Sequence, residues 1–363
     1  MTKVLTSINL PIAICSLLLL SVGILVIFTS SHELAIQQLI FAVIGIISFL
    51  FISYLDYRSI KNFITPLYII IFLLLIFVLF LGIETRGSVR WIPLGFFNVQ
   101  PSEFAKPVLI LILANFWAKN YPNWKNIGKS LLWTLPFTFF IFQQPDLGSA
   151  LTLMAIWLGM LLASHVSFKK IIILSLITIL IVPMGWISLH DYQKQRVFSF
   201  LDPQSDPLGR GYNLIQSTIA VGSGQLLGRG LGQGTQSRLQ FLPEFRTDFI
   251  FASIAEEMGF IGCVAILFLY IFLIAYFVSL SEKAFDFFGN LIVLGVMSML
   301  FFQTSVNIGM NIGLIPITGI TLPLISYGGS SLVATLISLG LIASVARFKK
   351  RIDPDQIGID IQS

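Results

Sequence analysis

Long apolar runs alternate with short polar connections along most of this 363-residue chain. A helix that crosses the hydrocarbon core of a bilayer needs about 20 mainly apolar residues. Ten segments approach this length, namely residues 10–29, 35–55, 63–82, 103–118, 130–144, 147–164, 170–189, 249–279, 287–307 and 328–346. The pattern therefore predicts an all-α, polytopic integral membrane protein with about ten transmembrane helices.

One connection between these segments is long. Residues 190–248 form a large loop, in which YNLIQSTIAV (212–221) is typical of a short amphipathic helix. The sequence contains no visible internal repeat and no soluble domain of any size. We therefore expect residues 1–363 to form a single membrane domain that includes this loop.

A second irregular segment follows the ninth apolar run. Residues 307–329 are apolar, but Pro316, Pro323 and five glycines interrupt them. Non-helical backbone at membrane depth is tolerated only where it is buried in protein or lines a cavity. Two interpretations stay open: a re-entrant hairpin within the membrane region, and a loop that lies over the outer face.

The composition agrees with a membrane protein. Mean hydropathy is +0.90, and only 11% of residues are charged, against about 25% in a soluble domain. The first apolar run, Leu10 to Phe28, is too long for a signal-peptide core and lacks a cleavage site, so we expect it to be retained. Cys15 and Cys263 lie in apolar runs and build neither a disulfide framework nor a metal motif. The modest net charge of +5 gives no reason to expect a nucleic-acid partner.

The positions of Lys and Arg orient the chain, because cytoplasmic loops carry an excess of these residues. The outside turns 30–34, 145–146 and 308–327 carry none if the N-terminus is cytoplasmic. We therefore predict a protein of the cytoplasmic membrane, with both termini cytoplasmic and loop 190–248 extracytoplasmic. Thirteen bases then lie in inside segments: Lys3, Arg58, Lys61, Lys119, Lys125, Lys129, Lys169, Lys170, Lys283, Arg347, Lys349, Lys350 and Arg351.

The remaining nine bases lie in two outside segments, and such segments are typical of a site for an anionic ligand. Alternatively, long loops are translocated regardless of their charge, which accounts for the long loop better than for the short connection. The bases are Arg86, Arg90 and Lys106 in the short connection, and Lys194, Arg196, Arg210, Arg229, Arg238 and Arg246 in the long loop.

Polar residues gather where the fourth apolar run begins, in QPSEFAK (100–106). Ser102 is a candidate helix N-cap, and Glu103 lies in the first turn, where the helix dipole favours an anion. Glu103 and Lys106 are three residues apart and so share a helix face. They form either a local ion pair that lets the helix enter the membrane or a polar wall of an outer cleft.

Other outer features are candidate parts of such a cleft. Arg86 and Arg90 offer guanidinium groups suited to phosphate oxygens, and Trp91 is either an interfacial anchor or a neighbour of the same site. In QQPDLG (143–148), Asp146 is best interpreted as part of a capped tight turn. The glycine-rich run 222–234 could form amide nests for phosphate, but it lacks P-loop spacing and a Rossmann context.

The stretch FLPEFRTDFIFASIAEEMGFIG (241–262) carries four acids into an apolar helix. A charge near the bilayer centre costs about 2.5–3.5 kcal/mol on the insertion scale. Asp248 stands near the water boundary, beside Arg246. Glu256 and Glu257 lie about two turns deeper, and at about 100° per residue the three acids cannot share one face. The two glutamates either pair with another helix or have a functional role.

These motifs together resemble the SEDS family, named for shape, elongation, division and sporulation. The matching stretches are RWIPLG, QPSEFAK, QQPDLGSAL, DPLGRGY, FLPEFRTDFIFASIAEEMG and ITGITLPLISYGGSS, which extend over nearly the whole chain. The stretch GTQSRLQFLPE and the short N-terminal tail are more similar to RodA than to FtsW members. One departure is Arg246, because the residue before TDF is commonly His in the family; the role of that His is left open, although a cation is retained.

The resemblance implies a peptidoglycan glycosyltransferase that polymerises lipid II into glycan strands at the outer face of the cytoplasmic membrane, for cell elongation and shape. It also implies a partner, a class B penicillin-binding protein that cross-links the glycan. The family's catalytic aspartate falls on Asp248. No cofactor is clearly implied, although carboxylates are available to Mg²⁺. The candidate substrate-binding residues are Arg86, Arg90, Trp91, Glu103, Lys106, Arg210 and Arg246, and the supporting residues are Glu256 and Glu257.

Two alternatives belong to other classes of protein. A flippase for the lipid-linked precursor needs a polar path with sites near the midplane, whereas the polar clusters here lie at the outer edge. A non-catalytic scaffold for a penicillin-binding protein would use the outer acids and bases as interface groups.

Overall fold

The structure is a computed structural model that describes residues 9–85, 88–93, 95, 98–188, 191–239 and 241–348. Each predicted span corresponds to a helix, which confirms the predicted fold class. The long helices are α2 (Leu10–Ser30), α3 (His32–Tyr54), α4 (Ile64–Leu81), α5 (Pro101–Trp117), α6 (Trp124–Gln143), α7 (Leu147–Ala163), α8 (Phe168–Ser188), α12 (Ile250–Glu282), α13 (Phe287–Asn311) and α14 (Gly329–Arg347). Within the described residues, six segments are long and apolar enough to cross a membrane: α2, α3, Ser59–Phe80, α12, α13 and α14.

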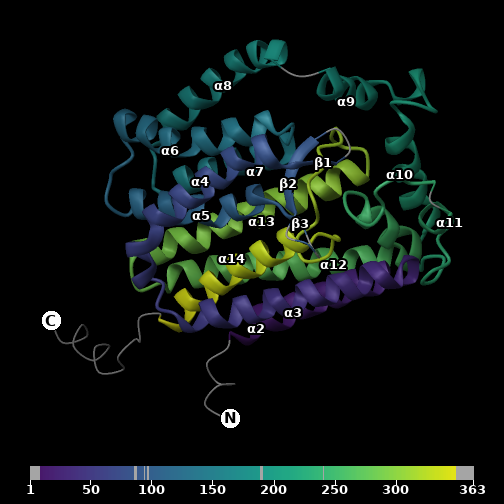
Figure 1. The fold of residues 1–363 in the computed structure, drawn as a ribbon, viewed down its shortest axis with the longest axis horizontal. Coiled ribbons are helices and arrows are strands. Elements are labelled where there is room, and N and C mark those ends of the chain that lie inside the picture. Colours follow the sequence, from purple (N-terminus) through teal and green to yellow (C-terminus); the bar gives the residue numbers. More distant parts are fainter. Residues whose placement is uncertain are drawn as a thin grey trace.

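The long helices run side by side, and their two ends differ (Figure 1). At one end, called the inner end below, α2 begins and α14 finishes. The opposite, outer end carries a small sheet and the short elements of the long loop. These elements are η2 (Pro203–Ser205) and the helices α9 (Asp191–Leu201), α10 (Tyr212–Ser223) and α11 (Thr235–Arg238).

Helix α5 forms the centre of the bundle. Its residues Ala105, Leu109 and Leu113 are fully buried, and the helix contacts α4, α6, α7, α13 and α14. Helix α14 packs chiefly along α3. Their approach is close, since a Cβ at Gly340 would lie 3.0 Å from the carbonyl oxygen of Phe49. Small residues at helix contacts allow backbones to approach in this way.

Helix α8 lies apart from the bundle and arches over α4, α6 and α7 in Figure 1. Its apolar side chains are well exposed, for example Leu176 at 55% and Leu180 at 73%. In a membrane these side chains meet lipid tails. The start of the helix is attached to the α5–α6 connection, because Lys170 Nζ donates to the carbonyl oxygen of Pro122 at 2.6 Å.

The α4–α5 connection contains a small antiparallel sheet that the hydrophobic pattern does not indicate. Its strands are β1 (Ile83–Thr85), β2 (Ser88–Pro93) and β3 (Asn98–Val99), paired in the order β1-β2-β3. Ile83 pairs with Trp91, and Ile92 pairs with Val99. The sheet brings β2 to the outer end, next to the α6–α7 turn.

The second half of the irregular segment after α13 packs against the bundle. Ile320, Leu322 and Ile325 have at most 4% of their surface exposed. Its backbone finds partners inside: Gln38 Nε2 of α3 donates to the carbonyl oxygen of Ser326 at 3.1 Å, and the Tyr270 hydroxyl donates to that of Pro323. Protein therefore surrounds the second half of this segment, as non-helical backbone at membrane depth requires, and the choice between a re-entrant hairpin and a loop over the outer face stays a prediction.

Helix α12 is broken at Gly259, whose φ of 68° is not helical. The break exposes carbonyl groups, and the glycine-rich loop supplies donors to them. The N–H groups of Arg229 and Gly230 donate to the carbonyl oxygens of Glu256 and Glu257 at 2.9 and 3.0 Å. In return, Phe260 N–H donates to the carbonyl oxygen of Gln225 at 2.8 Å. These amides therefore hold the loop against the break in α12.

Candidate functional site

Asp248 lies at the outer end, two residues before α12, and the fold fixes its backbone. Its carbonyl oxygen accepts hydrogen bonds from Asn307 Nδ2 at 2.9 Å and from Asn311 Nδ2 at 3.0 Å, both on α13. The Asp248 side chain is partly exposed. The backbone of Asp248 is therefore fixed at the outer end of the bundle, and most of the residue is covered by protein.

A cation faces this carboxylate across Gly319. A Cβ added at Gly319 would lie 3.5 Å from Oδ2 of Asp248 and 3.6 Å from Nη1 of Arg196. Arg196 belongs to α9 and also donates to the carbonyl oxygen of Ile317 at 3.4 Å. Gly319 has a φ of +75°, which disfavours any other residue. The glycine thus leaves open the space between the acid and the base.

The surroundings of Asp248 raise the pKa of its carboxyl to about 6. Burial is the largest cause, and the negative charge of Glu244 acts in the same direction. Arg196 lowers the pKa, Asp146 raises it and Arg90 lowers it. The group is therefore mostly ionised at neutral pH but is close enough to its pKa to accept a proton.

Arg90 and Asp146 form the neighbouring part of the site, at the contact between β2 and the α6–α7 turn. Arg90 Nε donates to the carbonyl oxygen of Gln144 at 2.9 Å, and Nη2 donates to that of Pro145. Arg90 Nη1 lies 3.9 Å from Oδ1 of Asp146. Asp146 caps α7 by accepting from Ser149 N–H at 3.0 Å, which agrees with the capped turn predicted there.

Glu103 and Lys106 form a buried ion pair in α5. Lys106 Nζ lies 2.7 Å from Oε1 of Glu103, and the two side chains are 3% and 8% exposed. Glu103 lies in the first turn, as predicted, but Ser102 is not the N-cap. The helix begins at Pro101 with Gln100 as N-cap, because proline is favoured at the first helical position. The pair is covered by protein, so it does not offer a free charge at the surface.

Glu256 and Glu257 hold the long loop onto the bundle. The Glu256 carboxylate accepts from the N–H groups of Gln236 and Ser237 at 2.9 and 3.2 Å, at the start of α11. The Glu257 carboxylate accepts from the Thr29 hydroxyl on α2 at 3.4 Å. The two carboxylates are thus bonded to α11 and α2.

The other residues predicted to bind substrate lie on different parts of the chain. Arg246 Nε donates to the Ser30 hydroxyl at 2.8 Å, and its Nη2 donates to the Ser30 carbonyl oxygen at 3.2 Å. These bonds place its guanidinium at the end of α2, where burial lowers its pKa. Arg210 is exposed in a turn capped by Asp206. Trp91 is partly exposed on β2, and Arg86 lies outside the described residues.

Sequence reasoning did not select Arg196 for the site. It appears in the sequence as one of six bases in the long loop, and no local motif marks it. Its proximity to Asp248 arises only because α9 folds over the segment that carries Gly319. The basic character of the loop was the available signal, and it did not distinguish Arg196 from its neighbours.

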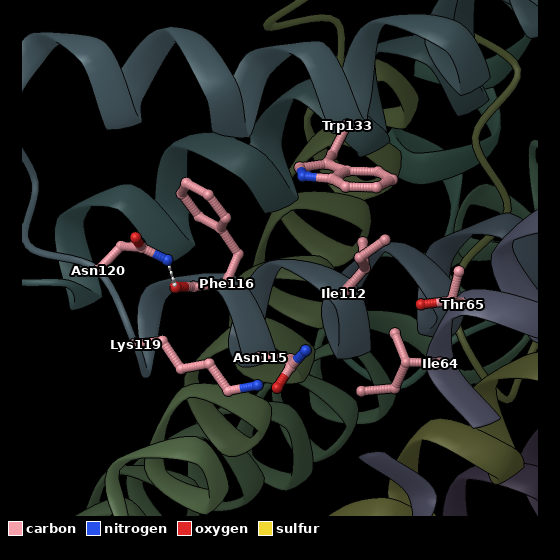
Figure 2. A pocket seen from close by; sticks show the side chains of 8 residues that line it. All are labelled: Ile64, Thr65, Ile112, Asn115, Phe116, Lys119, Asn120 and Trp133. Atoms are coloured by element: carbon pink, nitrogen blue, oxygen red, sulfur yellow. Dashed lines mark hydrogen bonds between the residues drawn. The ribbon is translucent and has the colours of Figure 1, made fainter. Parts of the chain in front are cut away.

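Two recesses of the described surface are formed without Asp248. One lies between α12 and α13 and has a volume of about 230 Å³. The other, between α4, α5 and α6, has a volume of about 170 Å³ (Figure 2). The described residues contain no group of three or more His, Cys, Asp or Glu side chains that could hold a metal ion.

Comparison with known proteins relates the whole chain to one family. The sequence model of the FtsW, RodA and SpoVE family, described as "Cell cycle protein", matches residues 3–351. The peptidoglycan glycosyltransferase MrdB of Escherichia coli strain K12 is 42% identical over 287 residues, which cover 78% of each chain. Stage V sporulation protein E of Bacillus subtilis strain 168 is 37% identical over 370 residues, covering 96% of this chain and 100% of the relative.

Solved structures agree with these relatives. A chain in a structure described as "Structural coordination of polymerization and crosslinking by a peptidoglycan synthase complex" matches with a TM-score of 0.82 and 32% identity, covering 95% of this chain and 99% of that chain. The crystal structure of the Thermus thermophilus rod shape determining protein RodA matches with a TM-score of 0.72 and 28% identity, covering 95% and 98%.

Proposed function

We propose that this chain, which belongs to the FtsW, RodA and SpoVE family, polymerises lipid II into glycan strands at the outer face of the cytoplasmic membrane. It is a multi-pass membrane protein and a peptidoglycan glycosyltransferase of the RodA type, which serves cell elongation and shape. Its similarity to MrdB over 78% of the chain supports this activity.

One observation carries the chemical part of the proposal. The carboxyl of Asp248 has a pKa of about 6 and lies at the outer end of the bundle. Gly319 separates it from the guanidinium of Arg196. An acid that can accept a proton next to a cation that can hold an anion suits glycosyl transfer from a lipid diphosphate.

In the proposed reaction, a hydroxyl of the acceptor sugar attacks the anomeric carbon of the donor sugar. A new C–O bond forms while the bond from that carbon to the diphosphate oxygen breaks. Asp248 takes the hydroxyl proton as the general base, and the lipid diphosphate leaves with the electron pair. General-base assistance typically contributes about 10²- to 10⁴-fold.

Cations stabilise the charge that develops on the leaving diphosphate. Arg196 is the base that directly faces Asp248, and Arg90 adds a second positive charge beside Asp146. Lys106 is neutralised by Glu103 within α5, so the proposal assigns the phosphate to the two arginines. A divalent cation, where the reaction uses one, would be held by the substrate diphosphate together with Asp146 or Asp248, because Mg²⁺ commonly binds to one or two carboxylates plus substrate phosphates.

The partner is a class B penicillin-binding protein, which cross-links the polymer that this chain makes. The similarity to a chain of a complex that coordinates polymerisation with cross-linking supports this pairing. The proposed orientation places both termini in the cytoplasm and the Asp248 end outside, where the lipid-linked sugar is presented.

The substitution Asp248→Asn tests the proposal, because it keeps the shape of the side chain and removes the proton acceptor. Purified wild type should convert lipid II into glycan polymer, and the variant should do so about 10²- to 10⁴-fold more slowly. Both proteins should show the same yield, thermal unfolding and binding to the penicillin-binding protein.

The alternatives give different results. A scaffold would yield no polymer with either protein, and a flippase would instead move lipid II across vesicles without polymerising it. An Asp248→Asn variant that polymerises at the wild-type rate would remove Asp248 from the mechanism.

A further inference from the structure

A recess at the inner end lies far from Asp248 and has no part in the proposed chemistry. It opens between α4, α5 and α6 and has a volume of about 170 Å³ (Figure 2). Its lining residues are Ile64, Thr65, Ile112, Asn115, Phe116, Lys119, Asn120 and Trp133. Ile64 is the first residue of α4, and Lys119 follows the end of α5, so the recess meets the inner membrane boundary.

The recess is apolar inside and polar at its mouth. Figure 2 shows the Trp133 ring above Ile112, with Ile64 and Thr65 on the α4 side. In the same view the Lys119 side chain runs toward Asn115, and its amine ends beside the Asn115 amide. A site with hydrocarbon walls and a cationic rim suits an amphipathic anion, since lysine keeps its head group in water while its stem covers apolar surface.

The α5–α6 connection beside the recess is basic. No Asp or Glu occurs between Glu103 and Asp146, whereas Lys119, Lys125 and Lys129 lie in that interval. Within the described part of the chain, the ion pairs found do not include Lys119. The Lys119 ammonium therefore has no ion-pair partner among the described residues.

A polar group inside the recess also lacks a partner. Oδ1 of Asn115 is buried and accepts no hydrogen bond from the described residues. The neighbouring Asn120 side chain already donates a hydrogen bond, from its Nδ2 to the carbonyl oxygen of Phe116 at 2.7 Å. Asn115 lies one helical turn, about 5.4 Å, deeper than Lys119. The Lys119 side chain spans this distance, and its amine ends beside the amide in Figure 2, so one phosphoglycerol group can contact both.

We propose that this recess binds one anionic phospholipid of the inner leaflet. The phosphate lies against Lys119, the glycerol region meets the Asn115 amide, and one acyl chain lies between Trp133 and the isoleucines of α4 and α5. The site goes beyond the proposed glycosyl transfer, because the lipid is bound and not converted.

Lipid competition tests the selectivity of the site. The full-length protein in detergent is offered equal amounts of phosphatidylglycerol and phosphatidylcholine, and retained lipid is counted by native mass spectrometry. The wild type should retain phosphatidylglycerol preferentially. Lys119→Gln should reduce that preference about fivefold, which corresponds to about 1 kcal/mol for one Lys near an anionic head group.

Lys125→Gln is the matched control. Lys125 is exposed on the first turn of α6 and does not line the recess. Equal losses from the two lysine variants would mean diffuse surface attraction and would overturn the site. Equal retention of phosphatidylglycerol and phosphatidylcholine by the wild type would also overturn the site. Preferential retention of a polyprenyl phosphate over phosphatidylglycerol would overturn it as well.

Trp133 provides an independent measurement. Phosphatidylglycerol with brominated acyl chains should quench tryptophan fluorescence more than brominated phosphatidylcholine, and Trp133→Phe should remove that difference. A Thr65→Trp variant fills the recess from its exposed side and should abolish retention while leaving thermal unfolding unchanged. If a folded Thr65→Trp protein retains the lipid, or if Trp133→Phe keeps the selective quenching, the recess is not the binding site.

Discussion

Asp248 has opposing charges around it, and each affects its protonation in a known direction. Glu244 raises the pKa of the Asp248 carboxyl, and Arg196 lowers it. A general base must be ionised, so activity should fall as the pH drops through about 6. Glu244→Gln keeps an acceptor for the Thr247 hydroxyl, which donates to Glu244 Oε2 at 3.1 Å, but removes the negative charge. The acid limb of kcat/KM should therefore move to lower pH.

Arg196→Gln should move the acid limb of kcat/KM to higher pH, because removing a cation makes ionisation of Asp248 harder. Glu33→Gln is the control, since Glu33 is exposed at the start of α3 and is not among the causes of the Asp248 shift. Shifts of the same sign in the Glu244 and Arg196 variants, measured from pH profiles of polymer synthesis, would contradict the assigned base.

The Glu103–Lys106 pair should be more important for stability than for phosphate binding. Lys106→Ala leaves a buried carboxylate unpaired, and breaking such a pair typically costs about 3–5 kcal/mol. We expect a lower thermal midpoint and weaker polymerisation. The double variant Glu103→Gln with Lys106→Met removes both charges and should recover most of both properties. A double variant that unfolds normally and remains inactive would show that the pair acts in the chemistry.

At the residue scale, the sequence identified groups with a local signature. Asp248 stands between a polar loop and an apolar helix, and Glu103 and Lys106 have helical spacing. Arg196 has no such signature, because its role depends on a contact between α9 and a segment about 120 residues later in the chain. Arg246 stands two residues before Asp248, yet its side chain binds the end of α2.

At the scale of elements, the glycine loop and the broken α12 form one packed unit. Gly228 has a φ of +79°, and a Cβ there would meet the Glu257 carbonyl oxygen closer than real contacts allow. Gly228→Ala should therefore destabilise the fold by more than the roughly 1–2 kcal/mol that a left-handed conformation costs alone. Thermal unfolding and proteolysis of loop 224–238 measure the effect.

Gly222→Ala is the matched control in the same loop. Gly222 lies in α10, and a Cβ there would meet nothing within 4 Å. Alanine is favoured over glycine in a helix by about 1 kcal/mol, so this variant should be neutral or slightly stabilising. Equal damage from both substitutions would contradict the packing of the loop on α12.

The apolar pattern predicted every long helix, with ends usually within a few residues, because helix length is set by the bilayer. It missed three features, one local and two that depend on contacts between segments. Helix α6 begins at Trp124 rather than near residue 130, since its first turns are polar but are capped by Asn123. The β1–β3 sheet has strands of two to six residues, and Gly259 lies inside an apolar run that resembles continuous helix.

At the scale of the whole molecule, the distribution of charge and the position of the site require the same orientation. Lys119, Lys125 and Lys129 lie at the inner end, and Asp248 lies at the other. Because basic loops are retained in the cytoplasm, Asp248 should face the outside, where a lipid-linked sugar must arrive for polymerisation. The recess at Lys119 should then meet the inner leaflet, whose anionic lipids attract basic residues.

Cysteine labelling checks this orientation directly. Cys15 and Cys263 are both buried, so background labelling of the intact protein should be low. A membrane-impermeant thiol reagent added outside intact cells should label Gln204→Cys, because Gln204 is exposed in η2 at the outer end. It should miss Lys125→Cys at the inner end, and also Gln362→Cys, which lies outside the described residues. The opposite pattern would place Asp248 in the cytoplasm, where it could not act on the outward-facing precursor, and would overturn the proposed site together with the topology.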